Sequence, residues 1–133
     1  MNTYSLETTI AEKVDAILNL MEFSSRMKDY YDIYYLAGKF DFDGATLTKA
    51  LRKTFGNRGH TFTMEQFEQV MAFDRDDTMQ KKWKAFCRKI DTKTDDYKTV
   101  LYNIEAFLAK PFAAAIEGKD FTEQWIASNC EWK

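Results

Sequence analysis

R-M-K-D-Y-Y-D-I-Y-Y-L-A-G, residues 26–38, is the stretch around which the rest of this sequence is organised. On a helix, at about 100° per residue, Asp29 and Asp32 share one arc with two aliphatic residues, and the four tyrosines fill two further arcs. No plainly polar face remains after the first turn, which is typical of a buried helix. Because buried carboxylates are costly unless they are paired, both aspartates need cationic partners. Arg26, Lys28 or a residue of another helix could supply them.

The composition is that of an ordinary globular domain. At 133 residues the chain is long enough for one hydrophobic core and too short for two. Its net charge of −2 argues against a general attraction to nucleic acid or anionic membranes, although it leaves room for a local basic patch. We find no apolar run of membrane-spanning length and no signal-peptide pattern, so no membrane contact is expected. The two cysteines, Cys87 and Cys130, fall outside any metal-binding spacing, which fits a reducing environment and a cytoplasmic location.

Most apolar residues recur at helical spacing, and only five glycines and one proline interrupt them. Ser5 is expected to cap a first helix whose apolar face covers residues 6–21, with residues 22–25 as the turn that follows. Gly38 is expected to end the second helix, because glycine is the commonest residue just past a helix end. Asp43 is expected to cap a third helix.

The second half of the sequence continues this helical pattern. Residues 63–66, Thr-Met-Glu-Gln, fit a capping box for a short fourth helix. The acidic run Asp74–Asp77 precedes a fifth helix. A long helix from Tyr97 should be kinked or restarted by Pro111 and should end before Gly118.

The C-terminal tail holds Trp125 and Trp132 and is expected to pack back on the helices as a last short helix or arm. No segment shows the alternating pattern of a strand, and no repeat or low-complexity segment is present. The sequence therefore predicts an all-α fold, a single compact bundle of about five to seven helices that forms one domain over residues 1–133.

Lys13 lies at the edge of the apolar face of the first helix, roughly 20° outside it on the helical wheel. Its long side chain can extend into solvent or lean over the second helix towards Asp29. Glu12 and Asp15 are expected to point away from the core. A cluster of Lys13 with Asp29 and Asp32 is either a buried structural ion pair or part of a site, and the residues alone favour neither interpretation.

The motifs of the common nucleotide and metal sites are missing from the sequence, which has no G-x-x-x-x-G-K-[ST], G-x-G-x-x-G, C-x-x-C or H-E-x-x-H. With a single histidine no zinc site is expected, and His60, in a glycine-flanked loop, is interpreted as a solvated loop residue. Asp41-x-Asp43 looks like a metal-binding pair, but a helix cap explains Asp43 better. We therefore predict no metal ligands in this chain.

Two further groups of residues allow both a functional and a structural interpretation. The four tyrosines of residues 30–35 could stack nucleobases, but aromatic residues at helical spacing belong more often to a core, as does Cys87. The outer face of the fifth helix could hold the phosphates of RNA, although a charged outer face is the default for an amphipathic helix. That face carries five cations and no acid among them: Lys81, Lys82, Lys84, Arg88 and Lys89.

The order of the motifs carries a family resemblance. Tyr4-Ser5-Leu6-Glu7, then Ala11-Glu12-Lys13, and then residues 26–36 resemble the C-terminal half of the AbiEii/AbiGii family. These are nucleotidyltransferase-like toxins of bacterial abortive-infection and type IV toxin–antitoxin systems. The resemblance is strong over residues 4–59 and looser beyond. The positions that fit after the motif helices are Phe42-Asp43, Leu47, Leu51, Thr54-Phe55, Arg58-Gly59, Phe107-Leu108, Pro111 and the tryptophan tail.

The resemblance implies an active site. In the family, a lysine in the A-E-K helix and an aspartate in the R-x-K-D-x-x-D helix are active-site positions, and they match Lys13 and Asp29 here. Lys13, Arg26 and Lys28 would face nucleotide phosphates, while Asp29 and Asp32 would position the lysine or act as a base. The complete enzyme would transfer nucleotides from a nucleoside triphosphate and Mg²⁺ to RNA, with the end of a tRNA as the expected acceptor.

One departure from the family matters equally. The family holds its metal in an N-terminal sheet domain, with a Gly-Ser or Gly-Thr turn and a D-x-D pair that this sequence does not show. We therefore expect the helical C-terminal part of such a toxin, as a truncated gene, a split subunit or a fragment, inactive alone and binding Mg²⁺ and nucleotide only when completed. Its partners would be the missing catalytic half or the cognate antitoxin. A non-catalytic helical module that binds a partner protein, and a degenerate remnant, are the alternatives.

Overall fold

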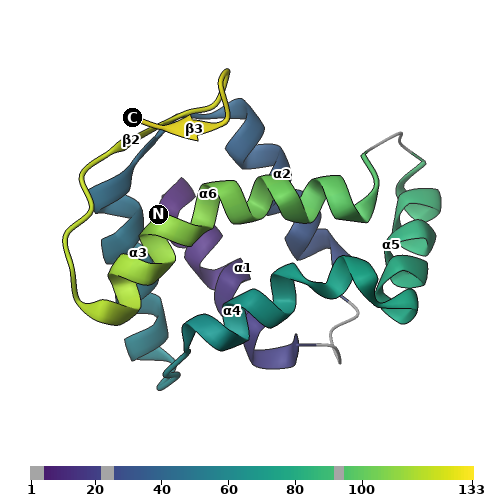
Figure 1. The fold of residues 1–133 in the computed structure, drawn as a ribbon, viewed down its shortest axis with the longest axis horizontal. Helices are drawn as coiled ribbons and strands as arrows, with labels where there is room; N and C mark the ends of the chain where they lie inside the picture. The colour runs from purple at the N-terminus through teal and green to yellow at the C-terminus, as the bar shows by residue number, and fades with distance from the viewer. Residues whose placement is uncertain (1–4, 22–25, 92–94) are drawn as a thin grey trace, which may run out of the picture.

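The computed structural model describes residues 5–21, 26–91 and 95–133, so the predicted turn at residues 22–25 lies outside the described residues. Within them the chain is mainly helical, as the sequence predicts (Figure 1). The helices are α1 (Leu6–Leu20), α2 (Met27–Lys39), α3 (Gly44–Asn57), α4 (Met64–Met71), the 3-10 helix η2 (Phe73–Arg75), α5 (Asp77–Ile90) and α6 (Tyr97–Glu117). Three short strands complete the described elements: β1 (Phe42–Asp43), β2 (Gln124–Ile126) and β3 (Glu131–Trp132).

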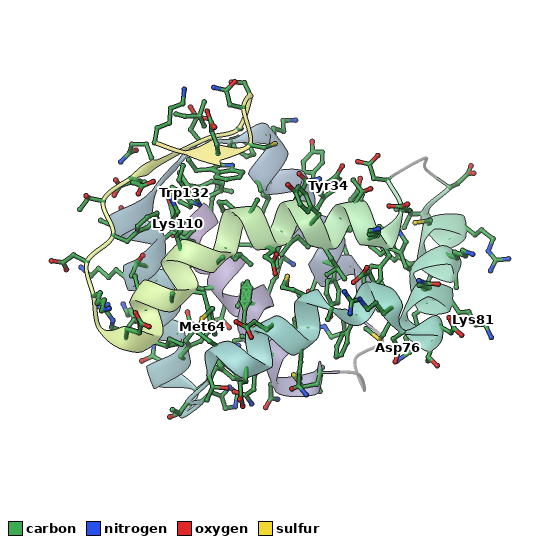
Figure 2. All side chains as sticks on the ribbon, in the orientation of Figure 1. Tyr34, Met64, Asp76, Lys81, Lys110 and Trp132 are labelled. Atoms are coloured by element: carbon green, nitrogen blue, oxygen red, sulfur yellow. The ribbon has the colours of Figure 1, made fainter. Side chains whose placement is uncertain are left out.

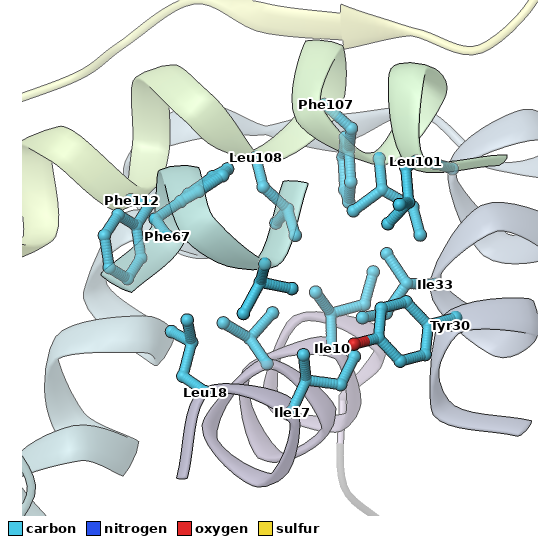
Figure 3. Packing of buried hydrophobic residues seen from close by; sticks show 14 of the residues in the cluster. Ile10, Ile17, Leu18, Tyr30, Ile33, Phe67, Leu101, Phe107, Leu108 and Phe112 are labelled. Atoms are coloured by element: carbon cyan, nitrogen blue, oxygen red, sulfur yellow. The ribbon is translucent and has the colours of Figure 1, made fainter. Parts of the chain in front are cut away.

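Helix α1 lies at the centre of the fold and packs against α2, α3 and α4. Helix α6 crosses over α2 and α3, and α5 stands at one end of the molecule against α2 and η2 (Figure 1). Aliphatic residues of α1 and α2 meet aromatic residues of α4 and α6 in the core (Figure 3). Phe67 and Phe112 pack edge to face there, with ring centroids 4.9 Å apart.

The predicted helix starts are confirmed. The side chains of Ser5, Asp43 and Thr63 each accept a hydrogen bond from the backbone N–H three residues further on. Gln66 completes the capping box at Thr63 by accepting from the Thr63 N–H. Asp43 is thus a helix cap, and Gly118 ends α6 in the left-handed conformation with φ 68°.

The predicted end of α2 is wrong by two residues. Gly38 lies inside the helix, and the C-cap is Phe40, whose N–H still bonds to the carbonyl of Leu36. Phe40 has an extended backbone, with φ −123° and ψ 148°, because the chain passes directly into strand β1. No left-handed residue is needed for that exit, so glycine has no conformational advantage at position 38.

Pro111 bends α6 without ending it. The helix is continuous from Tyr97 to Glu117, so the predicted restart does not occur, although its course changes direction midway (Figure 1). A proline cannot donate to the carbonyl four residues earlier, which here belongs to Phe107. The indole N–H of Trp132 donates to that carbonyl at 2.9 Å, so the C-terminal tail satisfies the group that Pro111 frees.

The tail forms strands, which corrects the expectation of a strand-free fold. Strand β2 pairs antiparallel with β1 and with β3, placing Trp125 between Phe42 and Trp132. The Trp125 indole donates to the carbonyl of Ala37 at 2.7 Å and fixes the strands to the end of α2. Strands of two or three residues are too short to show an alternating pattern, which is why the sequence predicts only a packed arm.

Candidate functional site

Lys13 of α1 lies between two aspartates in the first turns of α2. Its Nζ is 2.8 Å from Asp32 Oδ2 and 3.5 Å from Asp29 Oδ1. The two aspartates are three residues apart and therefore share one face of α2, which packs against α1. The structure thus brings together the three residues that the sequence nominates as catalytic.

Arg26 and Lys28 complete this cluster from the start of α2. Lys28 Nζ lies 2.7 Å from Asp32 Oδ2, and Arg26 Nε lies 3.0 Å from Asp29 Oδ2. That Asp29 oxygen is buried, yet among the described residues it accepts no hydrogen bond of good geometry. The Asp29 side chain is 4% exposed, against 20% for Asp32. Asp29 is therefore the inner member of the cluster and has unused acceptor capacity.

Asp32 is held in its ionised form by the two lysines. Burial opposes its ionisation, but hydrogen bonds and charge from Lys13 and Lys28 outweigh burial and lower its pKa below the ordinary value. Asp32 is consequently charged at neutral pH. It neutralises part of the positive charge of both lysines and fixes the Lys13 ammonium group between the two helices.

A hollow of about 330 Å³ opens beside the cluster. Its described lining contains three cations and a single carboxylate, a balance that favours an anionic ligand. Asp29 is not part of that lining, so it acts on the hollow through Lys13 and Arg26. The lining residues are Thr9, Glu12, Lys13, Ala16, Arg26 and Arg58.

Arg58 reaches the same hollow from the end of α3, and the sequence-based site does not include it. Its guanidinium forms an ion pair with Glu12 and lies 4.0 Å from Asp15. Nδ1 of His60 lies 2.9 and 3.0 Å from the two carboxylate oxygens of Asp15. A second charge cluster, of Glu12, Asp15, Arg58 and His60, therefore stands on the other side of α1.

This second cluster corrects two predictions. Asp15 does not point away from the core, because its side chain is only 3% exposed, and Glu12 is half-buried. His60 is not a solvated loop residue, since it bonds to Asp15 and packs against Phe62 with ring centroids 5.4 Å apart. The sequence did contain a sign that Asp15 is buried. Ala11 extends the buried arc of α1 towards position 15, and an acid on such an arc needs a partner.

The tyrosines of α2 divide between the core and the surface. Tyr30 is fully buried, as predicted, and burial raises its pKa to about 12. Tyr31 and Tyr34 pack against the core from its edge, and Tyr35 is 46% exposed, so the core assignment is wrong for Tyr35. Cys87 packs against the core as a partly buried residue, as predicted.

The basic residues of α5 lie apart from the hollow beside Lys13, and none of them is in its described lining. Lys81 lies on the outer side of α5 (Figure 2). Lys84, Arg88 and Lys89 are exposed, whereas Lys82 is half-buried. The predicted phosphate-binding and RNA-binding residues therefore form two separate regions.

The described residues show neither a cluster of metal ligands nor a membrane-spanning helix. Across residues 5–21, 26–91 and 95–133, no group of three or more histidine, cysteine, aspartate or glutamate residues is placed to hold a metal ion. Over the same residues, no helix has the length and apolar character needed to cross a bilayer.

Comparison with known proteins assigns the chain to a family. Searches of curated proteins and of solved structures found no match. A family model described as the nucleotidyl transferase AbiEii toxin of type IV toxin–antitoxin systems matches residues 1–117 of the 133. That match covers most of the chain, including both clusters on α1 and the whole of α6. This chain therefore belongs to the AbiEii nucleotidyltransferase toxin family of type IV toxin–antitoxin systems.

Proposed function

We propose that this chain is the helical part of an AbiEii-type toxin and that the hollow beside Lys13 binds the phosphates of a nucleoside triphosphate. The complete toxin would transfer nucleotides to an RNA acceptor, for which we propose the end of a tRNA. One observation carries the proposal: cations from three elements, Lys13, Arg26 and Arg58, converge on one hollow. Each of them is also positioned by a carboxylate.

Each residue of the site then has a defined task. Lys13, Arg26 and Arg58 bind phosphate oxygens, since all three line the hollow. Asp29 holds Lys13 and Arg26 from behind. Its second oxygen, which no described donor meets in good hydrogen-bond geometry, can accept a proton or hydrogen bond from a ligand once these side chains shift. Lys28 lies outside the lining, so it acts on the ligand only through Asp32.

The hollow fits a triphosphate but not a divalent cation. Its single described carboxylate, Glu12, is already paired with Arg58, whereas Mg²⁺ needs several oxygen ligands. We therefore propose that the metal is held by a D-x-D pair in a sheet domain supplied by a separate segment or subunit. Bound there, Mg²⁺ would neutralise triphosphate charge. The sequence-based expectation is that nucleotide binds only to the completed enzyme. Because three cations already converge on the hollow, we propose instead that this chain by itself binds nucleotide without transferring it.

The partners follow from the same proposal. Membership of a type IV toxin–antitoxin family implies a cognate antitoxin as partner. The part that supplies the metal-binding carboxylates would be the second partner, docking beside the hollow so that its metal reaches the phosphates held by Lys13 and Arg26. We propose the cytoplasm as the location, because nucleoside triphosphates and tRNA are found there.

Thermal unfolding with and without nucleotide tests the proposal. ATP, GTP, CTP and UTP are each added with Mg²⁺ to the wild type, to Lys13→Ala and to Lys49→Ala. Lys49 is an exposed lysine on α3 outside the hollow and serves as the matched control. A ligand that binds only the native state raises its stability, by about 2.7 kcal/mol at 100 times Kd. We expect Tm to rise with at least one nucleotide in the wild type and in Lys49→Ala, and to rise less in Lys13→Ala.

Each variant is compared with its own ligand-free Tm, so a loss of stability in Lys13→Ala does not obscure the result. An equal rise in Lys13→Ala would remove Lys13 from the phosphate site. No rise with any nucleotide, together with a large loss of stability in Lys13→Ala, would contradict the proposal. It would favour the alternative of a non-catalytic helical module, in which the Lys13–Asp29 pair only stabilises the fold.

A further inference from the structure

A second hollow near charged residues lies far along the chain from Lys13, between α5 and the start of α6. Its volume is about 720 Å³, against about 330 Å³ for the hollow beside Lys13. That size is within the range of small-molecule sites. The described residues that line it are Asp74, Gln80, Trp83, Lys84, Cys87, Arg88, Asp95, Asp96, Tyr97 and Lys98. None of them belongs to the two clusters on α1.

Two aromatic rings close the inner wall of this hollow. Trp83 and Tyr97 are each 3% exposed, and their rings lie 5.7 Å apart with a 31° angle between planes. The indole N–H of Trp83 donates to the carbonyl of Asp95 at 3.1 Å, which fixes the indole plane. Burial raises the pKa of Tyr97 and keeps its ring neutral at all physiological pH values. The wall is therefore rigid, aromatic and uncharged.

The outer rim carries three exposed cations. Lys84 and Arg88 are one turn apart on α5, Lys98 is in the first turn of α6, and all three are exposed. Within the described part of the chain, none of the three lies within salt-bridge distance of an acid, although Lys98 interacts electrostatically with the neighbouring Asp96. A cation in the first turn of a helix also opposes the helix dipole. A bound anion would offset that cost at Lys98.

The hollow also holds three carboxylates, and those of Asp95 and Asp96 accept hydrogen bonds. Asp95 accepts a hydrogen bond from the Tyr34 hydroxyl, and Asp96 caps α6 by accepting from the backbone N–H of Thr99 at 2.8 Å. Asp74 lines the hollow from η2, just before α5, and the Gln80 side chain donates to the backbone carbonyl of Asp74. The described lining thus carries three cations and three carboxylates, with Lys84 and Arg88 one and two turns beyond Gln80 on α5.

We propose that the α5–α6 hollow is a second nucleotide-binding site, with phosphates on Lys84, Arg88 and Lys98 and the base against the Trp83–Tyr97 wall. Exposed cations next to an aromatic wall can recognise the two parts of a nucleotide, its phosphates and its base. The nucleotide unit can come from a single-stranded RNA or from a free mononucleotide. In the first case the hollow would hold the acceptor of the proposed toxin, and that step alone rests on the proposed function.

Fluorescence anisotropy of a labelled single-stranded RNA of about ten nucleotides tests this site. The test variant is Lys84→Gln/Arg88→Gln. The matched control is Lys49→Gln/Lys53→Gln, which also removes two exposed cations four residues apart on one helix. We expect the test variant to weaken binding at least tenfold and the control less than twofold. For each cation that no longer binds a phosphate, the dependence of log affinity on log salt should fall by about 0.7.

A competition experiment distinguishes an RNA strand from a free nucleotide as the ligand. Displacement of the RNA by excess mononucleotide would assign the hollow to free nucleotides, and resistance to displacement would assign it to an RNA strand. Both results support a nucleotide site. No binding of either ligand, or equally weakened binding in the two double variants, would overturn it. The triphosphate proposal is judged by the nucleotide-dependent Tm of Lys13→Ala, and this proposal by the RNA affinities of the two double variants, so their failures remain distinguishable.

Discussion

The two sides of α1 carry charge clusters that are built in opposite ways. On the side of α2, the central helix supplies the cation, Lys13, and its neighbour supplies the buried acid, Asp29. On the side of α3, the central helix supplies the buried acid, Asp15, and its neighbour supplies Arg58 and His60. In both clusters the carboxylate is the buried member, with side-chain exposures of 4% for Asp29 and 3% for Asp15.

The shared arrangement explains how a small helical chain can hold cations around one hollow. A buried acid has a fixed position, and a long cationic side chain attached to it extends outward along a defined path. Asp29 fixes the positions of Lys13 and Arg26 in this way, and Asp15 lies 4.0 Å from Nε of the Arg58 guanidinium. The difference lies in the second partner. His60 can hydrogen-bond a carboxylate in its neutral or cationic form, whereas Lys13 is bound through its charge.

The largest effect is therefore expected from Lys13→Met, which removes the charge and keeps most of the apolar stem. Asp29 would stay buried with Arg26 as its remaining cation, at a cost of about 3 kcal/mol in the free energy of unfolding. The double variant Lys13→Met/Asp29→Leu should recover most of this stability, because an apolar pair can replace a buried ion pair. Urea unfolding measures both. A loss below about 1 kcal/mol in the single variant would show that Arg26 alone satisfies Asp29.

The two clusters also differ in how well the sequence predicts them. Lys13, Asp29 and Asp32 all lie within a span of 20 residues, on two helices whose facing arcs can be read from their periodicity. Asp15 and His60 are 45 residues apart, and their contact depends on where the α3 loop returns to α1. A helical wheel shows which arc a residue occupies, but not which distant loop covers that arc. The sequence misses the strands for the same reason. Trp125 and Trp132 donate to carbonyls of α2 and α6, and these contacts form only when the tail packs against both helices.

A smaller effect is expected from Asp15→Asn. Asparagine keeps an oxygen that accepts the hydrogen bond from His60 but loses the charge that attracts Arg58, so we expect a loss of about 1–2 kcal/mol. Glu12→Gln is the control, since the Glu12–Arg58 pair is half exposed and should contribute less than about 1 kcal/mol. The same urea series measures both variants. If Asp15→Asn costs more than Lys13→Met, the α3 side would be the stronger of the two clusters, contrary to our expectation.

The smallest effect concerns pH and separates Asp32 from the inner acids. Because Lys13 and Lys28 lower the pKa of Asp32 in the folded protein below its ordinary value of 3.8, the native state favours the ionised form. Asp32 therefore contributes stability above pH 3.8, and this contribution is lost as the pH falls through the lowered pKa. Tm measured between about pH 2 and pH 6 should fall less steeply with acid in Asp32→Asn than in the wild type. Parallel profiles would mean that the two lysines do not select the ionised form, and that Lys13 is held mainly by Asp29.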